Sequence, residues 1–132
     1  MPTPSHSAST EPAAPNHVAR RLVVLGTGGT IAGRARAAGD NVGYTAGEVG
    51  VADLLAGVSD MAGRLPALVG WALEAEQVAQ IDSKDMGPVV WRALLERVAH
   101  HLARPEVAGV VVTHGTDTLE ETAWLLQAVL SP

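Results

Sequence analysis

Apolar residues form two short unbroken runs along the chain. The first is Leu22-Val23-Val24-Leu25, ended by Gly26, and the second is Gly109-Val110-Val111-Val112-Thr113, followed by His114-Gly115. Unbroken apolar runs of this length are typical of strands that a parallel sheet buries on both faces. Apolar residues between positions 68 and 81 are less regular, so they predict one or two further strands with poorly defined ends.

Helical spacing of apolar residues separates these strands. Between positions 88 and 103 the apolar residues recur at intervals of three, four and seven, at Trp91, Leu94, Leu95, Val98 and Leu102. Because Pro88 suits the first position of a helix, the pattern predicts a helix from Pro88 to about Ala103. Residues 51–56 predict a short helix that stops before Gly57.

The last predicted helix has its own start signal. Thr118 and Glu121 have the spacing of a capping box, in which each side chain satisfies a free backbone amide of the first helical turn. The helix that follows carries apolar residues at helical spacing, namely Leu119, Ala123, Leu126 and Leu130. Residues 82–87 predict a turn, and the glycine-rich residues 33–50 predict a long loop that acts as a lid.

Alternating strands and helices predict an α/β fold with an open, mainly parallel sheet and flanking helices. Only three or four strands are visible, whereas open sheets usually have about four to six. We therefore expect residues 20–132 to form an incomplete domain. Residues 1–19 are rich in Pro, Ser, Thr and Ala and lack the apolar segment of a secretory signal, so we expect a disordered leader there.

The composition of the chain argues against several classes of partner and site. Its 132 residues carry 9 basic and 14 acidic side chains, a net charge of -5, with no basic stripe. Nucleic acid is therefore not an expected partner, and no apolar run is long enough to span a membrane. The absence of Cys removes disulfides, zinc-thiolate sites and cysteine catalysis.

Polar residues gather directly after both apolar runs. Residues 26–30, GTGGT, follow the first run, and residues 114–118, HGTDT, follow the second. Since ligands of open parallel sheets bind at the carboxyl ends of the strands, both clusters lie where a ligand of such a sheet is expected. The glycine-rich turn fails two nucleotide patterns: Ile31 stands where a dinucleotide motif needs glycine, and Arg34-Ala35 replaces the Lys-Ser of a P-loop.

Each cluster leaves two interpretations open. Without Cβ atoms, Gly28 and Gly29 permit a sharp turn that presents the Thr30 hydroxyl as a nucleophile, but Thr30 can equally hydrogen-bond to its own backbone. At the second cluster, Thr116 and Asp117 precede a helix whose positive N-terminus favours an ionised carboxylate and stabilises an oxyanion. Plain helix capping is the alternative interpretation of these residues.

Histidines are expected in structural roles. His100 and His101 lie near a helix end, where a solvated position is favoured over a metal site. His114 follows a strand, and a histidine that is hydrogen-bonded to a nearby backbone group is favoured over a catalytic base.

Four stretches together resemble the bacterial-type L-asparaginases. TGGTIAG at residues 27–33 and THGTDTLEETA at residues 113–123 are similar to the two signature stretches of that family. YTAGEVGV at residues 44–51 and IDSKDM at residues 81–86 match its pattern in the same order. The resemblance covers residues 21–130 and implies the incomplete N-terminal domain of a two-domain amidohydrolase that converts asparagine to aspartate and ammonia.

The resemblance also implies a role for each matching residue. Thr30 is the nucleophile that forms an acyl-enzyme ester, and Tyr44, on the lid, assists it. Ser83 binds the α-carboxylate of the substrate, and Asp117 binds its α-ammonium group. Thr116 orients the reacting centre, and its backbone amide joins the oxyanion hole. Gly29 is a further substrate-binding residue. No cofactor and no metal are implied.

The chain also departs from the family pattern. Lys84 stands where well-known periplasmic members carry Gln. The family completes its site with a lysine further along the chain and with a C-terminal domain from a neighbouring subunit. We therefore expect no measurable asparaginase activity from the 132-residue chain alone, and a cytoplasmic homo-oligomer, dimer or tetramer, for the full-length form. Glutamine remains an alternative substrate.

Two alternative functions stay open on the sequence. One is the asparaginase-like subunit of a tRNA-dependent amidotransferase, which would require ATP and charged tRNA. The other is a non-catalytic fragment that binds amino acids or associates with intact asparaginase subunits. Ammonia release from free asparagine separates the predicted enzyme from this second alternative.

Overall fold

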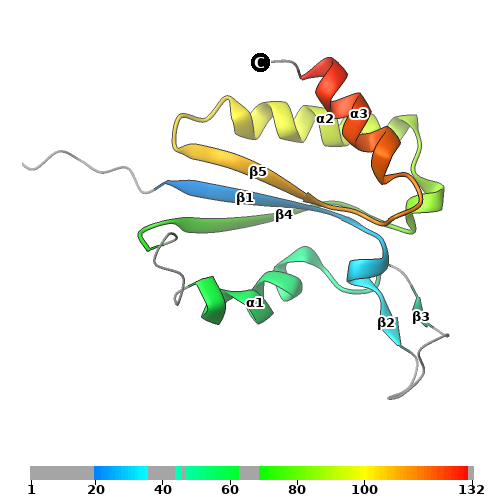
Figure 1. Cartoon of the computed structure of the whole chain (residues 1–132), viewed down its shortest axis with the longest axis horizontal. Coiled ribbons are helices and arrows are strands. Elements are labelled where there is room, and N and C mark those ends of the chain that lie inside the picture. The colour runs from blue at the N-terminus through cyan, green and yellow to red at the C-terminus, as the bar shows by residue number, and fades with distance from the viewer. Residues whose placement is uncertain (1–19, 36–43, 46, 63–68, 131–132) are drawn as a thin grey trace, which may run out of the picture.

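A three-stranded parallel sheet forms the centre of the structure, a computed structural model that describes residues 20–35, 44–45, 47–62 and 69–130. The strands lie in the order β4-β1-β5, with bounds β1 Arg21–Gly28, β4 Ala72–Ile81 and β5 Val107–Thr113. Three helices flank the sheet, with bounds α1 Val51–Ala62, α2 Pro88–Leu102 and α3 Leu119–Val129. Helix α1 lies on one side of the sheet and α2 on the other (Figure 1). The predicted open parallel α/β fold is confirmed.

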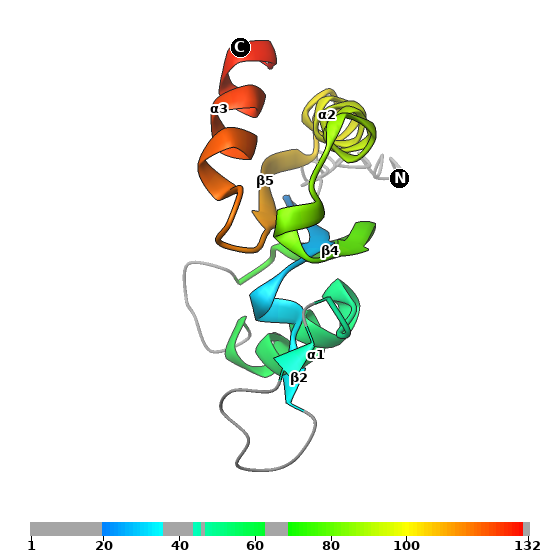
Figure 2. The same ribbon diagram turned by 90° about the vertical axis from the view of Figure 1, so that its right-hand side faces the viewer.

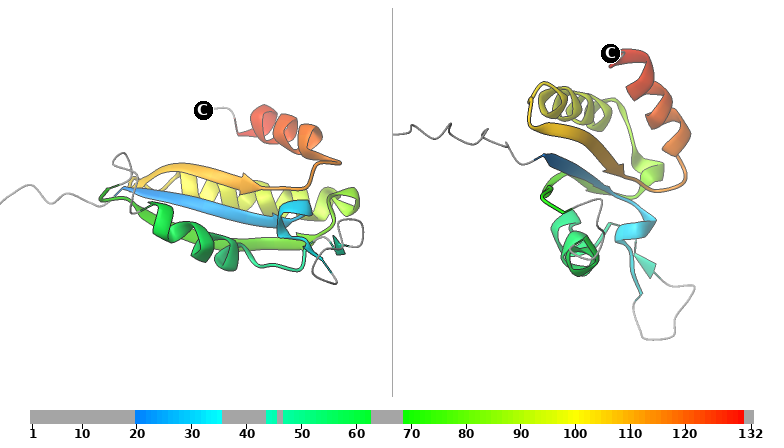
Figure 3. Two further views of the ribbon diagram at one scale, coloured as in Figure 1. Left: turned by 60° about the horizontal axis from the view of Figure 1, so that its bottom comes forward. Right: turned by 60° about the vertical axis from the view of Figure 1, so that its left-hand side comes forward.

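Helix α3 lies on the same side of the sheet as α2, past strand β5 (Figure 2). The layered arrangement of α1, the sheet and the two later helices is visible from further directions in Figure 3. Because all three strands run parallel, their carboxyl ends share one edge, where Gly28 pairs with Ile81 and Gly26 with Thr113. Two short 3-10 turns begin beyond that edge, with bounds η1 Thr30–Ala32 and η3 Ser83–Asp85.

The hydrophobic core forms around strand β1. Val23 and Leu25 have no exposed surface and pack against Leu94 and Val98 of α2. Alternate residues of a strand point to opposite faces, so Val24, which is also buried, faces α1. Burial on both faces of this strand was predicted from its unbroken apolar run and is confirmed.

Strand β5 is less buried than its apolar sequence predicts. It lies at one edge of the described sheet and pairs with β1 only, and Val111 is 45% exposed. The two apolar runs therefore differ in environment, because only β1 has a neighbouring strand on each side and a helix on each face. Sequence pattern alone does not distinguish a central strand from an edge strand of similar composition.

Helix boundaries agree with the sequence for α2 and differ for α1. Helix α1 continues through Gly57 to Ala62 instead of stopping at Ala56. Its first turn receives a cap from the sheet, since the Val51 amide donates to Gln77 Oε1 on β4 at 2.7 Å. A cap from a residue distant in the sequence stabilises the start of a helix, and the local sequence pattern does not show it.

The predicted capping box at α3 is wrong. Thr118 is the N-cap residue, but its side chain caps no backbone amide of the helix. Its hydroxyl donates instead to the Ser83 carbonyl at 2.8 Å. A tertiary hydrogen bond therefore takes the hydroxyl that the local pattern assigned to the helix end.

The expected loop at residues 33–50 contains a short ladder. Strands β2 and β3, Arg34–Ala35 and Tyr44–Thr45, pair antiparallel. Residues 36–43 and 46 lie outside the described residues, so the lid remains a prediction. The leader at residues 1–19 also lies outside them.

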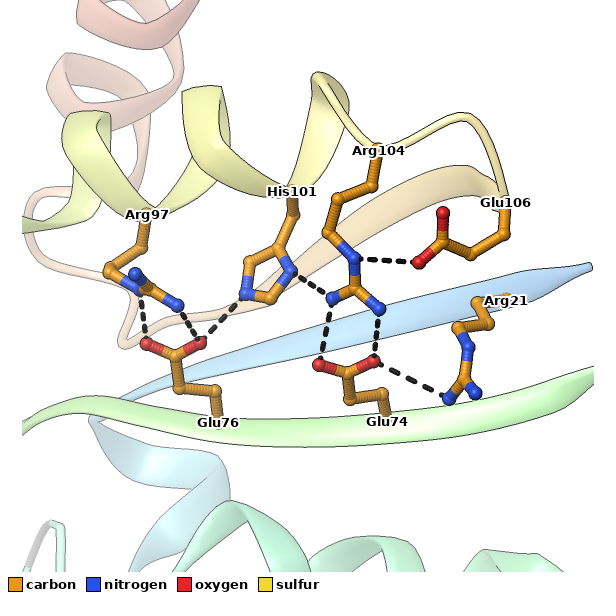
Figure 4. A network of polar contacts seen from close by, with 7 residues as sticks. All are labelled: Arg21, Glu74, Glu76, Arg97, His101, Arg104 and Glu106. Carbon is orange, nitrogen blue, oxygen red and sulfur yellow. Dashed lines mark hydrogen bonds and ion pairs between the residues drawn. The ribbon is translucent and has the colours of Figure 1, made fainter.

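A network of charged side chains joins β4 to the end of α2 (Figure 4). Its centre is His101, which is only 1% exposed, so the predicted solvated position is wrong for this residue. His101 Nε2 lies 2.7 Å from Glu76 Oε2, and Nδ1 lies 2.9 Å from Arg104 Nη1. Since a guanidinium group only donates, Nδ1 accepts and Nε2–H donates to the carboxylate, which defines a neutral tautomer.

Two arginine-carboxylate pairs flank this histidine. Arg97 binds both oxygens of Glu76, and Arg104 binds both oxygens of Glu74. The hydrogen bonds from Arg104 hold the pKa of Glu74 below its ordinary value of 4.5, and those from Arg97 do the same for Glu76. Bidentate pairs of this kind fix the position of α2 over the sheet.

This network predicts a loss of stability in acid. A carboxyl group whose pKa is lowered by folding contributes stability that is complete above its unfolded pKa and is lost as the pH falls through its folded pKa. The free energy of unfolding of the wild type should therefore fall more steeply between about pH 5 and pH 3 than that of Glu74→Gln. Urea denaturation at each pH measures this. Glu120→Gln, a change on α3 at a carboxylate without an ion pair among the described residues, should keep the wild-type slope.

Candidate functional site

The two polar clusters meet at the carboxyl edge of the sheet, as their positions in the sequence predict. The Gly29 amide donates to the Ile81 carbonyl at 2.8 Å, which ties the end of β1 to the end of β4. Gly28 and Gly29 have positive φ angles of 98° and 77°. A Cβ atom on Gly29 would overlap the backbone of Gly115 after β5. The three strand ends are therefore in direct backbone contact, which only glycine permits.

Ser83 joins the turn after β4 to the loop after β5. The residue is 4% exposed, and its Oγ accepts a hydrogen bond of 3.2 Å from the Asp117 amide. The Ser83 carbonyl accepts from the Thr118 hydroxyl, and a Cβ atom on Gly115 would overlap Ser83 Oγ. Because Ser83 Oγ is an acceptor in this bond, its own proton stays available for a ligand.

Thr27 adds a further connection between the strand ends, which was not predicted from the sequence. Its hydroxyl donates to the Thr113 carbonyl at 2.8 Å, and the residue is 1% exposed. This bond fixes the end of β5 to the end of β1 below the polar loop. A lone hydroxyl in an apolar strand is the sequence signal, since buried polar groups require a partner.

The exposed part of the site is acidic, with one nearby ammonium group. Lys84 Nζ lies 2.6 Å from Asp82 Oδ2 and 3.9 Å from Asp85 Oδ2. The hydrogen bond to Asp82 raises the pKa of Lys84, and the Asp85 and Asp117 carboxylates add to this effect. The same bond lowers the pKa of Asp82. Among the described residues of the site, three carboxylates act on this ammonium group, and their excess negative charge favours a further positive group of a ligand.

The predicted site residues divide into those that the structure describes fully and those that it describes in part. Ser83, Thr116 and Asp117 lie together at the strand ends, and the last two are exposed. The backbone of Thr30 begins η1 directly after Gly29, and the backbone of Tyr44 lies in β3. The side chains of Thr30 and Tyr44 lie outside the described part of the structure, so their roles remain predictions.

His114 has the structural position that the sequence predicts. Its Nδ1 lies 2.7 Å from the carbonyl oxygen of the next residue, Gly115. Its Nε2 contacts the Thr122 hydroxyl, which also accepts a hydrogen bond from the Trp91 indole. In the sequence Trp91 falls in an apolar stripe and Thr122 has no predicted role, although a packed indole N–H usually finds a hydrogen-bond partner.

The glycine contact predicts a large difference between two alanine substitutions. Gly29→Ala places a Cβ atom into the Gly115 backbone at a positive φ, so it should lower the free energy of unfolding by about 2 kcal/mol or more. Gly57→Ala is the control, because its Cβ atom would meet nothing within 4 Å inside α1. That change should stabilise the protein by about 0.5–1 kcal/mol. Urea denaturation of both variants measures the difference, and equal effects would contradict the described contact.

Within the described residues, no group of three or more His, Asp or Glu side chains is arranged to hold a metal ion. No helix in the same part of the chain has both the length and the apolar character needed to cross a membrane. The described part of the site presents hydroxyls, backbone amides and carboxylates at the end of a parallel sheet. These groups define a class of sites that binds small polar molecules at strand ends.

Comparison with known proteins gives the family. The sequence profile of the family "Asparaginase, N-terminal" matches residues 21–132, and the chain belongs to this family. It is 42% identical over 108 residues to the glutaminase-asparaginase of Pseudomonas fluorescens biotype A, covering 82% of this chain and 28% of that protein. It is 38% identical over 122 residues to L-asparaginase 2 of Bacillus subtilis, covering 92% of this chain and 30% of that protein.

A solved structure agrees with the fold. The crystal structure of the probable cytoplasmic L-asparaginase from Campylobacter jejuni superposes with a TM-score of 0.70 at 38% sequence identity. The superposition covers 81% of this chain and 31% of that one. The chain therefore spans less than a third of the length of each of these three relatives.

Proposed function

We propose that this chain supplies the nucleophile-bearing half of an amidohydrolase site that converts L-asparagine to L-aspartate and ammonia. The observation that carries the proposal is the direct contact of Gly29, Ser83 and the loop of Thr116 and Asp117 at one sheet edge. The hydroxyls, free backbone amides and carboxylate at this edge are the groups that bind the carboxylate, amide and ammonium groups of a small amino-acid amide. The named activities of the relatives support the same substrate class.

Thr30 attacks the side-chain amide carbon in this proposal. A position of Thr30 beside the Thr116 loop is supported by the preceding residue, Gly29, which contacts Gly115 directly. Attack forms an acyl-enzyme ester as ammonia leaves, and water then hydrolyses the ester to release aspartate. A threonine hydroxyl needs a proton acceptor, and Tyr44 assists in this role.

Ser83 and Asp117 bind the other end of the substrate. The Ser83 hydroxyl proton donates to the α-carboxylate, since its oxygen already accepts from the Asp117 amide. The Asp117 carboxylate pairs with the α-ammonium group, an interaction that the acidic surroundings of Asp82 and Asp85 reinforce. This arrangement selects free asparagine over an asparagine residue within a peptide, whose α-nitrogen is an uncharged amide.

A chimera tests the proposal. In it, residues 21–130 replace the matching segment of the Pseudomonas fluorescens glutaminase-asparaginase, so this chain provides the nucleophile. The expected result is steady release of ammonia and aspartate from asparagine. The same enzyme without the segment is the control and should be inactive. A folded chimera that binds asparagine without releasing ammonia would overturn the proposed activity.

A further inference from the structure

The loop after β5 is held by a chain of three hydrogen bonds that crosses from α2 to α3. The Trp91 indole donates to Thr122 Oγ1 at 2.8 Å, and Thr122 Oγ1 lies 2.9 Å from His114 Nε2. His114 Nδ1 lies 2.7 Å from the Gly115 carbonyl oxygen. Thr122 is 2% exposed, so solvent competes little for its hydroxyl.

The direction of each bond follows from its chemistry. A carbonyl oxygen only accepts, so His114 Nδ1 carries a proton and donates to Gly115. In the neutral imidazole Nε2 is then an acceptor, and the Thr122 hydroxyl donates to it. That hydroxyl is in turn polarised by the bond that it accepts from Trp91. These three hydrogen bonds thus fix the Nδ1–H tautomer of His114, whereas free histidine favours the Nε2–H form.

The series of hydrogen bonds ends at the carbonyl of the peptide group that joins Gly115 to Thr116. The Gly115 carbonyl and the Thr116 amide belong to the same planar trans peptide, so they point in opposite directions. Fixing the carbonyl therefore fixes the direction of the Thr116 N–H, and accepting a hydrogen bond strengthens that N–H as a donor. The Thr116 amide makes no hydrogen bond to any residue that the structure describes.

We propose that His114, held by Thr122 and Trp91, is a positioning residue that aims the Thr116 amide at the oxyanion of the reaction. This inference rests on the proposed function for the identity of the ligand, but the aim of the amide is a property of this chain alone. Gly115 contacts both Gly29 and Ser83, so a small rotation of its peptide would also disturb the neighbouring turns.

Nitrogen-15 NMR of the 132-residue chain with labelled histidine tests the tautomer. The expected result is an Nδ1–H imidazole for His114 in the wild type and in Thr122→Ser, which keeps the hydroxyl. Thr122→Val should lose this preference, because the donor to Nε2 is gone. An Nε2–H tautomer in the wild type, or the same tautomer in the Ser and Val variants, would overturn the inference.

The NMR resonance of the Thr116 amide tests the orientation of the peptide group between Gly115 and Thr116. It should shift in His114→Leu and in Thr122→Val, and return toward the wild-type position in His114→Asn, whose side-chain amide nitrogen takes the place of Nδ1. An unshifted Thr116 amide in Thr122→Val would contradict the inference even if His114→Leu failed to fold.

Titration with L-aspartate, the product, connects the aim of the peptide to the ligand. The β-carboxylate should shift the Thr116 amide, and Thr122→Val should weaken aspartate binding by about threefold to tenfold, the effect of one ordinary hydrogen bond. Equal affinity of the Ser and Val variants would overturn the inference. Absence of aspartate binding in every variant, with the tautomer and the Thr116 amide shifts as expected, would count against the proposed function and leave the positioning of the amide by His114 supported.

Discussion

Thr30→Ala in the chimera should abolish turnover of asparagine while leaving the fold intact. Removing the hydroxyl removes the only atom that forms the ester in the proposed mechanism, so kcat should fall on the order of a thousandfold or more. The backbone of residue 30 follows the glycine turn at the end of β1, and residue 30 is not a member of the core cluster of Val23, Leu25, Leu94 and Val98. Ammonia release gives the rate, and urea denaturation gives the stability.

Thr30→Ser is the matched control. Serine keeps the hydroxyl and loses only a methyl group, so it should retain measurable turnover with unchanged stability. A Thr30→Ala chimera that kept a substantial share of the original rate would move the nucleophile to another residue. Thr116 would then be the first candidate, because it lies in the loop that contacts the same turn.

Asp117→Asn should raise KM for asparagine strongly and lower kcat as well. The substitution keeps the shape of the side chain but removes the charge that pairs with the α-ammonium group. A hydrogen bond to a charged group contributes about 1.5–3 kcal/mol, which corresponds to roughly a tenfold to hundredfold loss in kcat/KM. The backbone amide that donates to Ser83 Oγ is unaffected by the change.

Succinamic acid, the analogue of asparagine without the α-amino group, separates recognition from chemistry. The original chimera should use it poorly. If Asp117 acts through the ammonium group, Asp117→Asn should lose far more activity on asparagine than on succinamic acid. Equal proportional losses on the two substrates would show that Asp117 serves the reaction or the fold instead.

The strands and the meeting of the two clusters could be predicted from the sequence. Unbroken apolar runs define β1 and β5, and parallel strands bring the residues after them to one edge. Burial depends on neighbours that the pattern does not show, which is why Val111 is exposed although it resembles Val24 in sequence context. The same limit applies to His101: its place near a helix end predicts a solvated position, but Glu76, 25 residues away in the sequence, lies beside it in the fold.

Side-chain hydrogen bonds across elements were the least predictable part of the site. The Thr118 hydroxyl matches a local capping pattern, yet it binds the Ser83 carbonyl, 35 residues away. The bond between Trp91 and Thr122 likewise spans 31 residues. Such pairs depend on how α2, α3 and the strand ends pack together, and that packing is decided by the whole fold and not by local spacing.

Trapping the acyl-enzyme tests the central claim most directly. The chimera is mixed with asparagine, quenched rapidly in acid, and digested for mass spectrometry. The account predicts a β-aspartyl ester on the peptide that contains Thr30, present with Thr30→Ser and absent with Thr30→Ala. An ester on the peptide that contains Thr116, or aspartate formation at the full rate without any dependence on Thr30, would contradict it.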